Sequence, residues 1–222
     1  MKKLKVLQQL VDAGVVAVLR ADSAEEVVRM ARYAIEGGIK AIEITMTVPN
    51  ALKAIEELSA QYSCEVDPTD PNFAIIGVGT VLDPETARAA ILAGSEYVVA
   101  PALNPDTVKL CNRYCVPCLP GVMTIQEIQS ALELGVDIVK LFPGNLYSPS
   151  MISTVKGPIP QANVMPTGGV SLANLKEWIQ AGAVAVGIGS DLTKEAVKTG
   201  NFDLIKEKSA AYMAAYREAK GL

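Results

Sequence analysis

EGGIKAIEIT (36–45), LAGSEYVVAP (92–101), ELGVDIVKLFPG (133–144) and QAGAVAVGIGS (180–190) repeat one pattern along the chain. In each stretch an amphipathic segment ends at a glycine, and a short run rich in β-forming residues follows. A glycine that closes a helix shortly before a strand is a common helix C-terminal signal. Four copies of this unit predict alternating β and α elements, and therefore a parallel sheet.

The apolar runs of the chain predict eight strands, at 15–20, 41–45, 73–77, 97–100, 116–119, 138–142, 164–166 and 185–187. Amphipathic patterns between them predict helices at 24–36, 51–61, 84–92, 105–113, 125–134 and 172–180. Eight β units in 222 residues fit a closed barrel better than an open sheet. We therefore predict an α/β fold, a single (β/α)8 TIM barrel with an N-terminal helix, that occupies residues 1–222 as one domain.

Composition and charge limit the functional classes. The formal net charge is −4 and no segment concentrates lysine or arginine, so we expect no binding to nucleic acid and none to an anionic membrane. The first residues are basic and then apolar, as in a signal peptide, but Gln8, Gln9 and Asp12 interrupt the apolar stretch and no cleavage site follows. We therefore predict that the first residues form an amphipathic helix and that the protein is cytoplasmic.

Histidine is absent from the sequence. Its absence excludes Ser-His-Asp and Cys-His nucleophilic machinery and every metal site that needs imidazole. Cys111, Cys115 and Cys118 have a spacing that radical enzymes use to hold an iron–sulfur cluster. They fall toward the N-terminal end of the predicted barrel, however, whereas catalytic groups occupy the opposite end. We interpret these cysteines as packing residues.

Lys140 interrupts the apolar run IVKLF. Strand alternation places it on the same face as Ile138 and Phe142, and we expect Val139 and Leu141 to face the helices. Lys140 then points into the barrel, where a desolvated lysine can act as a nucleophile that forms a Schiff base. The alternative is a lysine whose amine simply reaches solvent at the strand end.

Glu43 interrupts AIEIT in the same way, between Ile42 and Ile44. A buried carboxylate needs a partner, and an inward lysine on another strand supplies one. Without histidine, Glu43 is the natural candidate for the general acid–base group. A purely structural Lys–Glu pair in the barrel core is the alternative.

Anion-binding groups are predicted at the ends of three strands. Arg20 closes the first strand and can offer a fork of N–H groups to a carboxylate or phosphate, or else pair with surface acids such as Asp22. The turns PTGGVS (166–171) and GIGSDL (187–192) follow the last two strands, where barrels often bind phosphate. We expect phosphate contacts from Gly168, Gly169, Gly189 and Ser190, with ordinary tight turns as the alternative.

These residues together resemble one family of enzymes. The motifs VAVLR (16–20), IEITMTVP (42–49), GVGT (77–80), VKLFP (139–143), PTGG (166–169) and GIGS (187–190) occur in the order found in bacterial 2-keto-3-deoxy-6-phosphogluconate (KDPG) aldolases, which often also cleave 4-hydroxy-2-oxoglutarate (KHG). The resemblance covers essentially the whole chain. It implies a metal-independent class I aldolase, a lyase, without an organic cofactor.

The resemblance also implies roles for individual residues. Lys140 would form an iminium with the keto acid, and Glu43 would act through a water as acid and base. Family members are usually homotrimers whose partner is a small phosphorylated keto acid. The residues implied to contact substrate are Thr80 and Pro101 beside pyruvate, Phe142 near the Schiff base, and Gly168, Gly169 and Ser190 toward the phosphate; Thr167 and Gly189 are expected to bind substrate as well.

Thr47 departs from the family pattern. Many members carry an arginine at this substrate-binding position, two residues before the proline that is Pro49 here. Arg20 must then do more of the anion binding, and the preferred substrate stays open among KDPG, its galactonate epimer and KHG. There are two alternative hypotheses for the function. The chain is a phosphate-binding barrel enzyme with different chemistry, in which Lys140 is an acid, or it is a barrel that serves as an assembly scaffold.

Overall fold

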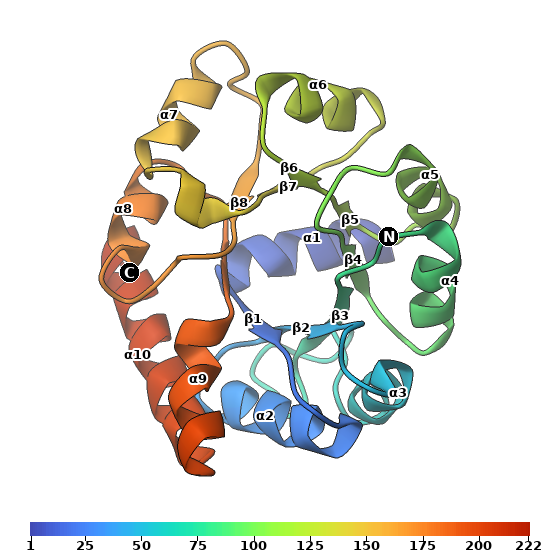
Figure 1. Ribbon diagram of the computed structural model, residues 1–222, viewed down its shortest axis with the longest axis vertical. Coiled ribbons are helices and arrows are strands. Elements are labelled where there is room, and N and C mark those ends of the chain that lie inside the picture. Colours follow the sequence, from blue (N-terminus) through green and yellow to red (C-terminus); the bar gives the residue numbers. More distant parts are fainter.

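The computed structural model describes residues 1–222, in which helices surround a central group of strands (Figure 1). The helices are α1 (Lys2–Ala13), α2 (Ala24–Glu36), α3 (Ala51–Gln61), α4 (Pro84–Leu92), α5 (Pro105–Arg113), α6 (Ile125–Glu133), α7 (Ser150–Lys156), α8 (Leu175–Gln180), α9 (Ser190–Thr199) and α10 (Asp203–Lys220). The strands are β1 (Val15–Leu19), β2 (Ala41–Thr45), β3 (Ile75–Gly79), β4 (Tyr97–Val99), β5 (Cys118–Leu119), β6 (Gly121–Val122), β7 (Val139–Leu141), β8 (Val164–Pro166) and β9 (Val186–Ile188).

Every strand pair is parallel, and the strands form two sheets. Six strands form a curled sheet in the order β5-β4-β3-β2-β1-β9, and three form a second sheet in the order β6-β7-β8. Pro120, which has no N–H to donate, separates β5 from β6. An isolated parallel bridge joins Thr167, after β8, to Gly187 of β9. The α/β class with a parallel sheet is therefore as predicted.

Local signals explain where the helices begin and end. The predicted bounds of α2, α3, α4 and α5 are confirmed, and so is an N-terminal helix. The side chains of Ser23 and Asp83 accept hydrogen bonds from the first turns of α2 and α4, and Thr124 forms a complete capping box with Glu127. The glycines of the four repeated units, Gly38, Gly94, Gly135 and Gly182, all have a positive φ.

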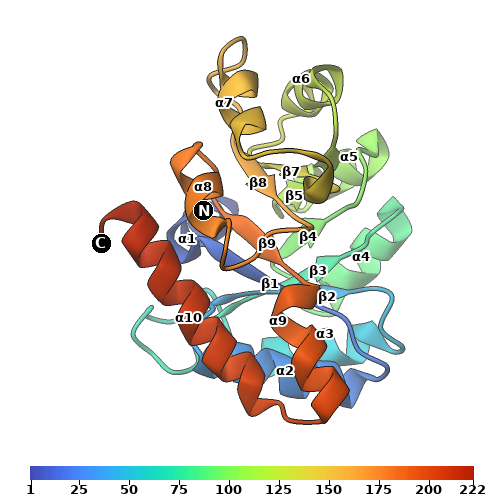
Figure 2. The same cartoon turned by 60° about the vertical axis from the view of Figure 1, so that its left-hand side comes forward.

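Some predicted bounds were wrong. The third strand begins at Ile75 rather than 73, because Phe73 closes a turn with its N–H on the carbonyl of Asp70. Helix α8 begins at Leu175 rather than 172, because the Asn174 side chain holds Ser171 and Gly169 in a turn. The sequence did not predict α7, α9 or α10. Helix α10 packs against α2, α8 and α9, and runs along the outer flank of the molecule (Figure 2). None of the helices combines the length and apolar character that crossing a membrane requires.

Alternate side chains of the strands belong to different layers. Ile42 and Ile44 of β2 pack in the outer core between strands and helices, whereas Val16 and Val18 of β1 lie in an inner cluster. Glu43 has the inward orientation that alternation predicts. The inner cluster also receives two side chains from α1, and its members are Val6, Leu10, Val16, Val18, Ala41, Cys64, Ile75, Tyr97, Val99, Leu119, Ile138, Met165 and Ala185.

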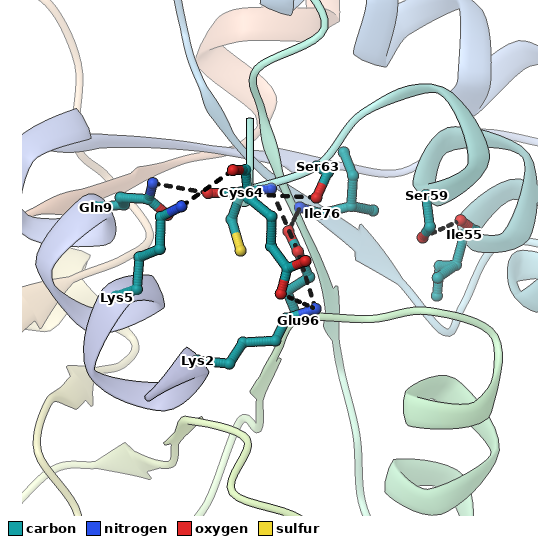
Figure 3. A network of polar contacts seen from close by, with 10 residues as sticks. Lys2, Lys5, Gln9, Ile55, Ser59, Ser63, Cys64, Ile76 and Glu96 are labelled. Carbon is teal, nitrogen blue, oxygen red and sulfur yellow. Dashed lines mark hydrogen bonds and ion pairs between the residues drawn. The ribbon is translucent and has the colours of Figure 1, made fainter. Parts of the chain in front are cut away.

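Helix α1 covers the N-terminal end of the strands, and a buried carboxylate holds it there. Glu96, directly before β4, accepts hydrogen bonds from the N–H groups of Cys64 and Ile76, each 3.3 Å long, and pairs with Lys2 of α1 at 3.4 Å (Figure 3). Gln9 of α1 donates to the carbonyl of Cys64 at 2.9 Å. This network ties α1 to the starts of β3 and β4 and closes that end of the molecule.

Replacement of Glu96 by leucine is expected to destabilise the protein by about 3 kcal/mol, because two buried N–H groups lose their acceptor. Urea unfolding followed by circular dichroism measures this change. The matched control is Glu65→Leu, which removes an exposed carboxylate that also faces Lys2, and should cost about 0.5 kcal/mol or less. A loss below 1 kcal/mol for Glu96→Leu would contradict the role given to this network.

Candidate active site

Lys140 of β7 and Glu43 of β2 form an ion pair in the interior of the molecule. Their Nζ and Oε1 atoms are 3.8 Å apart, and their side chains are 4% and 0% exposed. Strands β2 and β7 are not neighbours in either sheet. The two side chains therefore meet across the interior, which is the arrangement that strand alternation predicted for each of them.

Glycines of β3 make room for the carboxylate. Gly77 is the register partner of Glu43, and Gly79 lies two residues further along the same face. A Cβ atom on Gly79 would overlap the Glu43 carboxylate. Any other residue at Gly79 would displace Glu43 from Lys140, so GVGT (77–80) is part of the site's construction.

Neither carboxylate oxygen of Glu43 has a hydrogen-bond partner within the protein, although both are buried. A buried acceptor without a donor costs free energy, and such groups in native proteins often mark functional sites. The amine of Lys140 lies 5.0 Å from the centre of the Phe142 ring, which covers one side of it. The Glu43 carboxylate can therefore accept hydrogen bonds from a substrate or water.

A cleft of about 510 Å³ opens from Lys140 toward the surface. Eight of the predicted site residues line it: Arg20, Lys140, Phe142, Thr167, Gly168, Gly169, Gly189 and Ser190. The other residues in its wall are Val18, Val170, Ser171, Asp191, Lys194, Glu195 and Lys208. The structure therefore brings together the lysine, the arginine and both glycine turns.

The outer part of the cleft can bind an anion. Gly168 and Gly169 both have a positive φ, and neither N–H group donates to another backbone group. A Cβ atom on Gly169 would come within 2.7 Å of Asn145, so only glycine fits this turn. Helix α9 begins at Ser190, and residues of its first turn, Ser190 and Asp191, line the same cleft. Free N–H groups and a helix N-terminus favour a negatively charged ligand.

Three predicted substrate residues do not line this cleft. Thr47 is exposed and hydrogen-bonds through its hydroxyl to that of Thr45, at 2.8 Å. Thr80 has a φ of 57° directly after β3, and Pro101 follows β4, with its carbonyl against Gly121. All three lie at the C-terminal ends of parallel strands, on the same rim as Arg20.

Sequence reasoning missed the charged residues that α9 and α10 bring to the cleft. Lys194 lines it and makes no ion pair or hydrogen bond. Lys208 of α10 is held by Asp191, which also accepts a hydrogen bond from Tyr212. Burial and the Asp191 charge raise the pKa of Tyr212. Lys194 follows Ser190 by one helical turn, and this spacing in GIGSDLTK was the available signal.

The cysteines lie away from this site. Cys111 and Cys118 are buried in the outer core, and Cys115 is exposed. Contact with Cys111 and burial raise the pKa of the Cys118 thiol. The structure contains no group of three or more Cys, Asp or Glu side chains that could hold a metal ion.

Comparison with known proteins identifies the family. The family model described as KDPG and KHG aldolase matches residues 6–208. The 2-dehydro-3-deoxy-phosphogluconate aldolase of Treponema pallidum is 32% identical over 91% of this chain and 93% of its own. The 2-dehydro-3-deoxy-6-phosphogalactonate aldolase of Escherichia coli is 31% identical over 92% of this chain and 95% of its own.

Solved structures agree with these sequence matches. The KDPG aldolase of Legionella pneumophila, captured with pyruvate as a covalent carbinolamine intermediate, superposes with a TM-score of 0.81 at 26% identity, over 96% of this chain and 98% of its own. In each comparison, the match covers nearly the full length of this chain and of the related protein. The chain therefore belongs to the KDPG and KHG aldolase family.

Proposed function

We propose that this chain is a class I aldolase that cleaves KDPG to pyruvate and glyceraldehyde 3-phosphate through a Schiff base on Lys140. The observation that carries the proposal is the buried contact of 3.8 Å between Glu43 and Lys140, because Lys140 also lines the cleft formed by the two glycine turns. A nucleophilic amine beside a carboxylate, in a site shielded from water, is the arrangement that Schiff-base chemistry requires.

The reaction can be derived from these two groups. The neutral amine of Lys140 attacks the C2 carbonyl and, with loss of water, forms an iminium. Glu43, acting through a water, takes the proton of the C4 hydroxyl, and the C3–C4 bond breaks with its electron pair moving toward the iminium nitrogen. Glyceraldehyde 3-phosphate leaves, the resulting enamine takes a proton at C3, and water releases pyruvate and Lys140.

The remaining site residues have binding roles in this proposal. Gly168, Gly169, Gly189 and Ser190 bind the phosphate through N–H groups and a hydroxyl, assisted by Arg20. Phe142 and Thr167 line the cleft near Lys140, while Thr47, Thr80 and Pro101 border the pyruvate end from the rim. The second candidate substrate is the galactonate epimer of KDPG, because a phosphogalactonate aldolase is among the relatives at similar identity. KHG, which would yield pyruvate and glyoxylate, is a further substrate.

We also propose that residues 1–222 form one domain whose strands close into an eight-stranded TIM barrel. Two observations support closure: only Pro120 interrupts the chain between β5 and β6, and the Thr167–Gly187 bridge joins the ends of the two sheets. By family resemblance we propose a cytoplasmic homotrimer that acts in the Entner–Doudoroff pathway. Native mass spectrometry should then give three times the chain mass of 23.4 kDa, and a monomer mass would contradict the trimer.

Exchange of either member of the ion pair tests the proposed chemistry. Lys140→Met should abolish release of pyruvate from KDPG, because no Schiff base can form. Glu43→Gln should lower kcat by roughly 10²–10⁴-fold, as is usual for loss of a general acid–base group. Pyruvate is measured by coupling to lactate dehydrogenase. Lys176→Met, which removes an exposed lysine of α8, is the matched control and should retain full activity. Cleavage by Lys140→Met would refute the mechanism.

Arg20 is expected to bind the phosphate end of the substrate. It follows β1, which pairs with β9, so it lies beside the Gly189–Ser190 turn, and it forms no ion pair within the protein. Arg20→Gln should raise KM for KDPG about tenfold or more, since a charge-assisted hydrogen bond is lost. KM for KHG, which has no phosphate, should change less. Arg32→Gln on the surface is the control. Equal effects on both substrates would assign Arg20 to the shared carboxylate instead.

A further inference from the structure

Tyr97 of β4 has a buried hydroxyl for which the mechanism above gives no role. The side chain is 0% exposed, and its oxygen has no hydrogen-bond partner within the protein. Burial raises the pKa of Tyr97, and the charges of Glu43 and Glu96 raise it further, so the hydroxyl keeps its proton and is a donor. A buried hydroxyl without an acceptor carries a cost in free energy that a phenylalanine would not have.

Tyr97 belongs to the inner cluster of apolar side chains, together with Val6 and Leu10 of α1. Of the two carboxylates that act on it, Glu96 is already engaged by Lys2 and two N–H groups. Glu43 pairs with Lys140 at 3.8 Å, but neither of its oxygens accepts a hydrogen bond.

The strand register places Tyr97 beside Glu43. Glu43, Gly77 and Tyr97 are partners across β2, β3 and β4, and form one row of the sheet. A Cβ atom on Gly77 would overlap the Tyr97 ring, just as one on Gly79 would overlap the Glu43 carboxylate. The ring and the carboxylate therefore lie over neighbouring positions of one face of β3, where glycines leave space for both.

We propose that Tyr97 is a positioning residue of the aldolase reaction, whose hydroxyl donates through a buried water to the Glu43 carboxylate and holds it toward Lys140. The inference rests on the proposed function and adds a residue to its acid–base machinery. Such a water would have two polar partners, the Tyr97 hydroxyl and the Glu43 carboxylate, which have no hydrogen-bond partner within the protein. Lys140 reaches Glu43 from β7, whereas Tyr97 lies in the same row of the sheet as Glu43, on β4.

The variant Tyr97→Phe tests the inference, because it removes the hydroxyl and keeps the ring. Loss of a donor makes the charged form of the base less favourable, so the acidic limb of the kcat/KM profile should move to higher pH by about one unit. We expect kcat at neutral pH to fall about tenfold, with KM for KDPG nearly unchanged. Reduction with borohydride in the presence of pyruvate should still label Lys140 fully, which shows that the variant is folded.

Tyr216→Phe is the matched control. Tyr216 is also buried, but its hydroxyl donates to the carbonyl of Val11 at 3.3 Å, away from the cleft. This variant should keep the pH profile of the parent chain. An unchanged acidic limb in Tyr97→Phe, or the same shift in both variants, would overturn the inference. Absence of pyruvate release by the parent chain would instead refute the proposed function itself.

Discussion

The burial of two opposite charges in one interior is the constraint on which this structure depends. Removing Lys140 and Glu43 from water costs several kcal/mol for each ion, and their mutual attraction offsets this only in part. A well-packed apolar pair of similar size would serve stability as well or better. The chain retains the charged pair, with both carboxylate oxygens free, which is understandable if the groups are needed for chemistry rather than for folding.

The fold supplies what this pair requires. Parallel strands bring their C-terminal ends to one rim, where loops carry the groups that bind substrate. Alternation along each strand sends apolar side chains such as Ile42 and Ile44 outward and leaves the inner face to Glu43. The glycines of β3 give the carboxylate its space, and α1 closes the opposite end through Glu96. On the α1 side of the ion pair the inner cluster fills the interior, and on the other side the cleft opens from Lys140 toward the surface.

Much of this could be predicted because it depends on local patterns. The units around Gly38, Gly94, Gly135 and Gly182 carry both a helix stop and a strand, so the α/β class followed from them. Four helices have the predicted bounds, whereas most strands begin or end at a different residue than predicted. An isolated charge in an apolar strand indicated the interior position of Lys140. Helix α9 was missed because no side chain caps its start at Ser190.

Other features depend on contacts that no local pattern encodes. The wall of the cleft depends on how loops after different strands lie together, so the sequence did not show that Thr47, Thr80 and Pro101 lie on the rim outside it. Lys194 was missed because α9 itself was not predicted. Likewise, the alignment of Tyr97 with Glu43 depends on the register of three strands. The family resemblance supplied chemistry for the predicted residues, but it could not supply these distances.

The most direct test of this account is to trap the Schiff base. The protein is incubated with pyruvate, reduced with sodium borohydride, and digested, and the modified peptide is located by mass spectrometry. One reduced pyruvate adduct per chain is expected, on Lys140, in the peptide that contains VKLFP (139–143). An adduct on a different lysine would contradict the site. No adduct on folded protein would contradict the aldolase mechanism and favour a phosphate-binding barrel with other chemistry.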